Sequence, residues 1–308
     1  MEITRENISE WLKLLQDDIC KALEQADGLA TFKEENWKRE EGGGGRSRVI
    51  ENGKIIEKGG VMFSAVHGDV PDFLITDKQH AIQLDSPTKK DQFFATGVSI
   101  VIHPQNPMVP IIHMNIRYFE MSNGVKWLGG GIDLTPHYIV DEDAQFFHNR
   151  LKKVCDTHHN SYYSKFKTWA DDYFFINHRK ETRGIGGIFF DRLNKDESLN
   201  FEENFKFWQD VGKAFAPIYI ELINRNKDKD YTPENKQWQL LRRGRYVEFN
   251  LVYDKGTKFG LETNGRVESI LMSLPANASW LYNFQTKENS EEQNTLNKLK
   301  KGINWATI

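Results

Sequence analysis

The chain has 308 residues and a formal net charge of −3, so neither nucleic acid nor an anionic membrane surface is favoured as its partner on electrostatic grounds. Its two cysteines, Cys20 and Cys155, exclude a disulfide framework and a cysteine-based zinc site, and they favour a reducing compartment. No apolar run reaches the length of a membrane span, and the start, MEITRENISEWL, lacks the features of a signal or transit peptide. We therefore expect a cytoplasmic protein with one domain, residues 1–308.

The first predicted element is an amphipathic helix. Ile8, Trp11, Leu15, Ile19 and Leu23 recur at helical spacing, which places them on one face. Gly28 follows this pattern and is a typical helix stop. The helix is therefore expected to end near this glycine.

Extended segments and turn signals follow. Asn52-Gly53 and Asn123-Gly124 are strong hairpin signals, and a loop with three prolines lies between them. Hairpins join neighbouring antiparallel strands, so this part of the chain predicts an antiparallel sheet. The predicted strands are Arg46–Ile50, Lys54–Glu57, Phe93–His103, Ile111–Met121 and Val125–Asp133.

Helical patterns dominate the second half of the chain. A glycine-rich turn at Gly184–Gly187 leads into a predicted strand at Ile188–Phe190, and Tyr246–Asp254 is also predicted as a strand. The predicted fold class is α+β, with helices covering both faces of one large antiparallel sheet. The predicted helices are Asp141–His159, Tyr162–Asn177, Phe201–Asn224, Pro233 to about Arg243 with Thr232 as its cap, Glu268–Leu274 and Lys287–Lys301.

Polar side chains alternate along several of the predicted strands. In Ile111–Phe119, His113, Asn115 and Arg117 share one face. The same reasoning places Ser99 with His103, and Trp127 with Asp133. In Tyr246–Asp254 it places Tyr246, Glu248, Asn250 and Asp254 together. Such stripes are either the wet face of a half-covered sheet or the floor of a pocket, and helices on both faces favour the floor.

Other charged and glycine-rich patterns leave alternatives open. Gly42–Gly45 lacks the GK[ST] ending of a phosphate loop. This run is either a disordered surface loop or a mobile flap whose neighbours Arg39, Arg46 and Arg48 bind carboxylates. Arg179 and Arg183 are expected to face an anionic ligand. The histidines are dispersed and are a weak signal for a metal, whereas His113 is a candidate general base.

Six long blocks of sequence resemble the oxygen-dependent coproporphyrinogen-III oxidases. The resemblance runs from about Trp37 to Trp280. Two positions depart from the family pattern, because Ala170 stands where the family usually has Cys and Lys255 where it usually has Arg. The blocks are EGGGGRSR, FFATGVSIVIHPQNPMVP, HMNIRYFE, LGGGIDLTPHY, KTWADDYFFINHRKETRGIGGIFFD and RRGRYVEFNLVYDKGTKFGLETNGRVESILMSLP.

The resemblance implies an enzyme of haem biosynthesis. It implies oxidative decarboxylation of two propionates of coproporphyrinogen III to vinyls, giving protoporphyrinogen IX and two CO2. Dioxygen is the implied co-substrate and no organic cofactor is implied. A divalent metal is an open alternative. The implied assembly is a homodimer formed through roughly Tyr246–Leu281, around a sheet sandwiched between two helical layers.

The resemblance also assigns roles by motif. His113 is the implied proton donor. Arg183 is not assigned by the resemblance, but its charge makes it a candidate to bind a substrate carboxylate. The implied substrate contacts are Ser99, Asn115, Ile116, Arg117, Asn264, Gly265 and Arg266, and the implied metal positions are His103, His148 and His178.

Our mechanistic hypothesis is that Asp133, together with Asp254 as a second candidate, accepts a pyrrole N–H. His113 then removes a propionate β-hydrogen. Two other functions stay open: a metal-dependent oxygenase and a non-catalytic tetrapyrrole carrier. A nucleotide-binding enzyme that uses Gly42–Gly45 is a more distant alternative.

Overall fold

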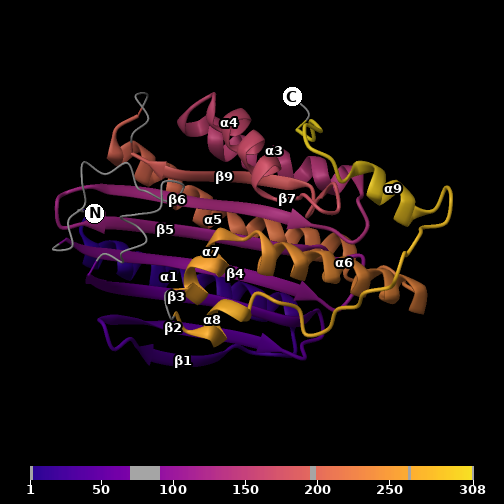
Figure 1. The fold of residues 1–308 in the computed structure, drawn as a ribbon, viewed down its shortest axis with the longest axis horizontal. Helices are drawn as coiled ribbons and strands as arrows, with labels where there is room; N and C mark the ends of the chain where they lie inside the picture. Colours follow the sequence, from indigo (N-terminus) through magenta and orange to yellow (C-terminus); the bar gives the residue numbers. More distant parts are fainter. Residues whose placement is uncertain (1–2, 70–90, 195–198, 263–264, 307–308) are drawn as a thin grey trace.

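The central feature of the fold is a seven-stranded antiparallel sheet (Figure 1). The structure, a computed structural model, describes residues 3–69, 91–194, 199–262 and 265–306. The strand order is β1-β2-β3-β4-β5-β6-β9, so only the β6–β9 connection is non-sequential. The strands are β1 (Lys33–Lys38), β2 (Gly43–Glu51), β3 (Ile56–Asp69), β4 (Gln92–Pro104), β5 (Ile111–Met121), β6 (Lys126–Thr135) and β9 (Gly186–Leu193).

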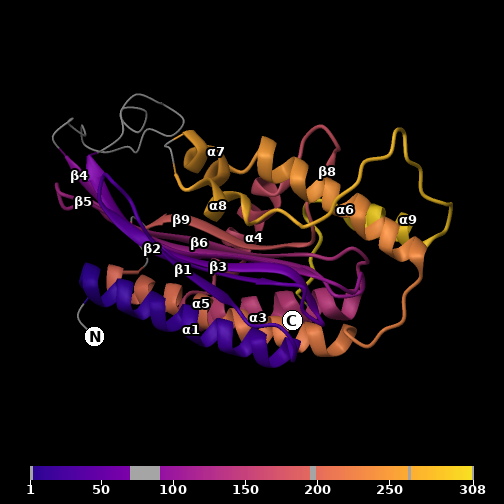
Figure 2. The same cartoon turned by 90° about the horizontal axis from the view of Figure 1, so that it is seen from below.

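Helices cover both faces of this sheet, as Figure 2 shows in side view. One layer holds α1 (Arg5–Asp27), α3 (Asp141–His158) and α5 (Phe201–Asn226). The other layer holds α6 (Pro233–Val252), α7 (Lys255–Glu262) and α8 (Val267–Leu271). The prediction of an α+β fold with a sheet between two helical layers is confirmed.

Smaller elements lie at the margins of the sheet. β1 is one edge strand and carries the charged sequence KEENWK. β9 is the other edge strand, and α4 (Tyr162–Tyr173) packs along it. The short ribbon of β7 (Phe175–Ile176) and β8 (Glu181–Thr182) precedes β9, and α9 (Glu291–Lys298) lies near the end of the described chain. Among the helices that the structure describes, none combines the length and apolar character that a bilayer crossing requires.

The two faces of the sheet differ in polarity. Ile100, Met114 and Ile132 pair in register across β4, β5 and β6, and each is completely buried on the face covered by α1, α3 and α5. Burial of such a side chain contributes roughly 1.5–3 kcal/mol to stability. Because strand side chains alternate, the residues between them must point to the opposite face, which α6–α8 cover only in part.

The predicted end of α1 near Gly28 is confirmed. Its N-cap is Thr4, whose side chain accepts a hydrogen bond from the amide of Asn7, and its C-cap is Gly28 with φ of 73°. The left-handed conformation at this position favours glycine, because a side chain there would be strained. The predicted strands flanking both Asn-Gly pairs are confirmed as well.

The predicted strand Tyr246–Asp254 is wrong, because these residues continue α6 to Val252. Tyr246, Phe249 and Asn250 are buried, whereas Leu251 and Val252 are each 46% exposed, which is a helical pattern of burial. The capping box of Thr232 and Asn235, with Pro233 at the first helical position, starts this long helix. The stripe of Tyr246, Glu248, Asn250 and Asp254 therefore does not exist as one strand face.

Candidate active site

One row of residues crosses the sheet on the face beneath α6–α8. In this row Ser99 of β4 pairs with Asn115 of β5, which pairs with Gly131 of β6. The next row contains Gly97, Arg117 and Gly129, and the row on the other side contains His113 paired with Asp133. We call Ser99, His113, Asn115, Arg117 and the three glycines the polar floor. The predicted stripe of His113, Asn115 and Arg117 is confirmed as its centre.

Glycine makes space for the arginine of the polar floor. A Cβ atom on Gly129 would lie 2.9 Å from Nε of Arg117 and 2.6 Å from Oδ1 of Asp191. A side chain at this position would therefore displace both charged groups. The glycine-rich sequence of β6 lets the long Arg117 side chain lie flat against the backbone of its neighbouring strand.

A buried chain of polar groups begins at His113. Its Nδ1–H donates to Oδ1 of Asp133 at 2.7 Å, and Nη2 of Arg183 donates to both oxygens of Asp133 at 2.8 and 2.7 Å. Nη1 of Arg183 donates to the side-chain oxygen of Asn250 at 2.9 Å. The side chain of His113 is 21% exposed, whereas those of Asp133 and Arg183 are 2% exposed. Of the side chains of His113, Asp133 and Arg183, only that of His113 reaches the polar floor.

Burial and charge have opposite effects on Asp133. Burial alone would raise the pKa of its carboxyl group, but the Arg183 guanidinium and the His113 side chain hold that pKa below its ordinary value. Both oxygens already accept hydrogen bonds from these neighbours. Asp133 is therefore an ionised partner of His113, and it does not offer an accessible oxygen to a pyrrole N–H as our hypothesis required.

Arg117 is the accessible guanidinium of the polar floor. Its Nη1 donates to Oδ1 of Asn115 at 3.0 Å and its Nη2 to Oδ1 of Asp191 at 2.7 Å, while the side chain stays 37% exposed. Asp191 lies on β9, next to β6. Arg117 is thus held in place on one side and open on the other, which suits it to bind a carboxylate with the remaining N–H groups.

Asp254 lies on the same side of the sheet, between α6 and α7. Its Oδ1 accepts from the hydroxyl of Tyr173 at 2.9 Å, and its Oδ2 accepts from the amide of Thr257 at 2.7 Å, which caps α7. Burial and the charge of Asp254 raise the pKa of Tyr173, so this tyrosine stays a donor. Arg117 interacts electrostatically with both Asp254 and Tyr173. Asp254 is therefore, besides Asp191, a carboxylate that interacts with Arg117.

Other predicted substrate residues lie in different places. The Ile116 side chain points to the opposite face and is fully buried in the core, because it alternates with Asn115 and Arg117 along β5. Arg183 is enclosed and is paired with Asp133. Arg266 reaches β1 and β2 instead, where it pairs with Glu35 at 2.6 Å and donates to Ser47. Gly265 precedes it, and Asn264 lies outside the described residues.

The two departures from the family pattern have different surroundings. Ala170 is completely buried in α4 and packs in a cluster with Phe174, Ile176 and Phe249. Lys255 is exposed at the start of α7, beside Asp254. Ala170 is therefore a packing position in this chain, and Lys255 can present its ammonium group to solvent or to a ligand.

The three histidines assigned to a metal do not come together. His148 uses both ring nitrogens, since Nε2–H donates to the carbonyl of Ile185 and Nδ1 accepts from the hydroxyl of Tyr163. His103 donates to the carbonyl of Ser273, and His178 contacts Glu248 and Tyr253. In the ranges that the structure describes, no three His, Cys, Asp or Glu side chains are grouped as a metal ion requires. These residues do not fit a shared metal site.

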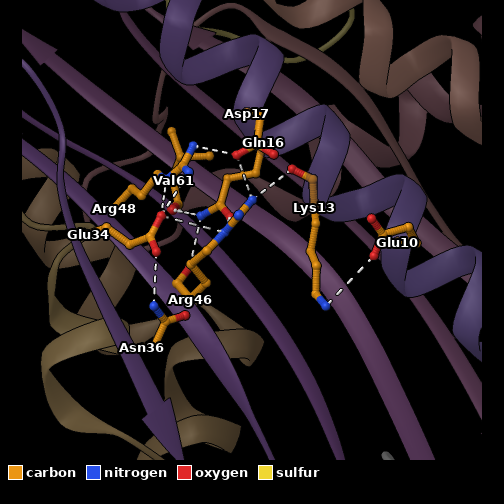
Figure 3. Close-up of polar contacts among 9 residues, drawn as sticks. All are labelled: Glu10, Lys13, Gln16, Asp17, Glu34, Asn36, Arg46, Arg48 and Val61. Carbon is orange, nitrogen blue, oxygen red and sulfur yellow. Dashed lines mark hydrogen bonds and ion pairs between the residues drawn. The ribbon is translucent and has the colours of Figure 1, made fainter.

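Gly43–Gly45 of the glycine-rich run lie in β2, and Arg46 and Arg48 are already paired (Figure 3), as is Arg39 with Glu41. Arg46 donates to Gln16 and Asp17 of α1, and Arg48 donates to Glu34 of β1. The predictions of a disordered loop and of a mobile flap for this run are both wrong. A hollow of about 380 Å³ lies beside these contacts, between Lys13 of α1 and Phe63 of β3. It is on the face opposite the polar floor.

Sequence reasoning missed Asn250, Asp191 and Tyr173 as members of the site. Asn250 was placed on a predicted strand, Tyr173 fell within the predicted helix Tyr162–Asn177, and Asp191 was only the end of a motif. The signal that could have pointed to them was the set of charged residues Arg117, Asp133 and Arg183, because buried or half-buried charges require partners. Their partners could not be chosen before the register between β6 and β9 was known.

The fold and the polar floor define an α+β protein with a His–Asp pair beside an accessible arginine on one sheet face. The chain matches the family described as Coproporphyrinogen III oxidase over residues 7–305. It is 44% identical over 325 residues to the oxygen-dependent coproporphyrinogen-III oxidase of Prochlorococcus marinus (strain AS9601), covering 98% of this chain and 93% of that protein. The chain belongs to the oxygen-dependent coproporphyrinogen-III oxidase family, as its motifs predicted.

Two mammalian relatives are similar over most of this chain. The mitochondrial oxygen-dependent coproporphyrinogen-III oxidase of Homo sapiens is 51% identical over 296 residues, and the Mus musculus protein of the same description is 49% identical. Each alignment covers 94% of this chain, but it covers 64% of the human protein and 66% of the mouse protein. The chain thus spans about two thirds of the length of these relatives.

Proposed function

We propose that the chain catalyses the dioxygen-dependent oxidative decarboxylation of two propionates of coproporphyrinogen III to vinyls, in haem biosynthesis. The observation that carries this proposal is the His113–Asp133 pair, 2.7 Å apart, on the same sheet face as the accessible Arg117. Family membership supports the substrate and the oxidant. No step of the proposed reaction uses a metal, because the predicted ligands do not fit one.

The polar floor suits a flat substrate that carries several carboxylates. Gly97, Gly129 and Gly131 add no side chains of their own to the polar floor, and the Arg117 side chain lies over Gly129. Arg117, with Asn115 and Ser99 beside it, offers donors to a propionate. We assign the pyrrole N–H to Asp254, since Asp133 is enclosed and Asp191 is paired with Arg117.

Each conversion of a propionate to a vinyl releases CO2, one C–H proton and two electrons, and dioxygen takes up the electrons. We assign the proton to Nε2 of His113, for which no hydrogen-bond partner is seen among the described residues. Asp133 holds the Nδ1–H of the same ring, so the free nitrogen is the one that can act as a base. Arg117 and Asp254 orient the substrate during this step.

The decisive experiment compares the chain with its Asp133→Asn variant. We expect the unaltered protein to consume dioxygen and release CO2 from coproporphyrinogen III in a chelator, and to do neither without oxygen. Asp133→Asn should lower kcat by ~10²-fold or more while substrate still binds, because the histidine loses its ionised partner. Binding of the substrate with neither oxygen uptake nor CO2 release by the unaltered protein would instead identify a carrier.

We also propose that the chain acts as a homodimer in the cytoplasm. Large apolar side chains are exposed along the segment implied in dimer formation, including Val267 at 49%, Trp280 at 52% and Leu281 at 55%. Exposed apolar side chains gathered in one segment favour a protein–protein contact. Native mass spectrometry of the full chain tests the dimer, and a monomer at micromolar concentration would contradict it.

A further inference from the structure

We propose that Arg183 is a positioning residue, fixed by Asn250 and three aromatic rings, that orients Asp133 and through it His113. The inference rests on the proposed function and assigns Arg183 a role different from the carboxylate clamp expected from its charge. It also adds Asn250, on α6, to the residues on which the reaction depends.

The first observation is the geometry of the ion pair between Arg183 and Asp133. One nitrogen, Nη2, donates to both carboxylate oxygens at 2.8 and 2.7 Å. Charge-assisted bonds of this length are strong and directional, and the surroundings exclude water, since each side chain is 2% exposed. The plane of the Asp133 carboxylate is therefore set by the guanidinium, and its Oδ1 is aimed at His113.

The second observation is an aromatic cage around Arg183. Its guanidinium carbon lies 4.4 Å from the ring centre of Phe174, 4.6 Å from that of Tyr246 and 4.7 Å from that of Phe249. Cation–π contacts of this kind stabilise a desolvated guanidinium. The rings come from α6 and from the end of α4, so the cation is enclosed by two elements and cannot swing out to the polar floor.

The third observation is the contact to Asn250. Its side-chain oxygen accepts from Nη1 of Arg183 at 2.9 Å, and the residue itself is 4% exposed. Its amide group donates to the hydroxyl of Ser273 at 3.4 Å. Asn250 thus has a fixed orientation, and it holds the one terminal nitrogen of Arg183 that does not contact Asp133.

The arrangement matters for the acid–base residue of the site. A buried carboxylate without a counter-ion takes up a proton, and a neutral Asp133 would hold the His113 ring less firmly. The charged and titratable groups that interact with Arg183 include Asp133 of β6, Tyr246 of α6, Asp254 after α6 and His103 of β4. Those that interact with Asp133 include Arg183, His113 and Tyr246. Arg183, together with His113, keeps the pKa of Asp133 below its ordinary value against the effect of burial.

The test uses Asn250→Ala, Arg183→Lys and Arg183→Met in the full chain. Asn226→Ala is the matched control, since Asn226 is another fully buried asparagine and lies on α5, in the other helical layer. The readouts are kcat and KM, the pH dependence of kcat/KM, and the ¹⁵N NMR signals of the His113 ring. The ring signals report which nitrogen carries the proton, and they are measured in the resting protein.

We expect Asn250→Ala to lower kcat about tenfold with KM nearly unchanged, because one bond to a charged group is lost. In Arg183→Met the acidic limb of the pH profile should move to higher pH, and the Nδ1–H signal of His113 should weaken. The kcat of Arg183→Lys should lie between those of Asn250→Ala and Arg183→Met, since lysine keeps the charge but not the planar guanidinium group. Asn226→Ala should change stability alone.

Two results would overturn the proposal. A raised KM in Arg183→Met or Asn250→Ala, with the pH profile and ring signals unchanged, would make Arg183 a substrate-binding residue. Lower stability with normal kcat, pH profile and ring signals would make its role purely structural. If Arg183→Met does not fold, Asn250→Ala decides between these outcomes. If the unaltered protein does not turn over coproporphyrinogen III, the NMR signals still test the orientation of His113.

Discussion

Two arginines near the polar floor have different roles because their surroundings differ. Arg117 is 37% exposed and is paired with Asp191, whereas Arg183 is 2% exposed and its two terminal nitrogens donate to Asp133 and Asn250. A guanidinium that keeps free N–H groups can bind a substrate carboxylate, and one that is enclosed can only orient its neighbours. Charge in the sequence marked both residues as clamps, but exposure could not be inferred from charge.

Replacement of Arg117 by lysine should weaken substrate binding. The ammonium group of Arg117→Lys keeps the charge but cannot contact Asn115, Asp191 and a carboxylate with one planar fork. We expect KM to rise about tenfold, with a smaller change in kcat. Steady-state kinetics measure this effect, and Arg225→Lys on the exposed side of α5 is the control. An unchanged KM would remove Arg117 from substrate recognition.

At the scale of elements, alternation along β5 predicted the polar floor correctly, because a strand has one unambiguous period. The same reasoning failed at Tyr246–Asp254, where buried residues at positions 246, 249 and 250 fit a helix equally well. The resemblance implied Ile116 as a substrate contact along with Asn115 and Arg117, but the side chain of Ile116 faces the core. The pairing of Asp133 with Arg183, and of Arg183 with Asn250, depends on contacts between β6, the segment before β9 and α6, which no local pattern encodes.

Asp27 connects α1 with the β2–β3 turn. This buried carboxylate accepts hydrogen bonds from the amides of Ala30, Ile55 and Ile56 at 2.9, 2.9 and 2.8 Å. Asp27→Ala should lower the free energy of unfolding by roughly 3 kcal/mol, because several buried donors lose their acceptor. Urea unfolding measures the loss, with the exposed Asp18→Ala as control. Equal stability of the two variants would contradict the assignment.

The whole molecule should lose stability in acid through two kinds of buried group. Burial lowers the pKa of His103 and of His148 to about 3, so both stay neutral in the fold but bind protons in the unfolded chain below about pH 6.5. Burial opposes the ionisation of Glu248, but its bonds from Arg179 and His178 lower its pKa to about 2. In both cases the unfolded chain binds more protons, so stability falls as the pH falls.

Thermal unfolding measured from pH 7 to pH 3 tests this expectation. The melting temperature should begin to fall below about pH 6.5, and it should fall more steeply below about pH 4.5, where carboxylates also titrate. In Glu248→Gln the melting temperature should fall less steeply below about pH 4.5. Its decrease just below about pH 6.5, which comes from the histidines, should remain. A melting temperature that is constant down to pH 4 would contradict the neutral state of the two histidines.

The charged residues of the edge strand β1 disfavour association of this sheet with other molecules in a concentrated solution. An open sheet margin is a template on which strands from other molecules can add and start a fibre. Lys33 and Lys38 would each require a matching charge on any strand that added there, and α4 shields the other margin along β9. Strand addition is therefore disfavoured at both ends, so a seven-stranded sheet can stay open without joining its copies.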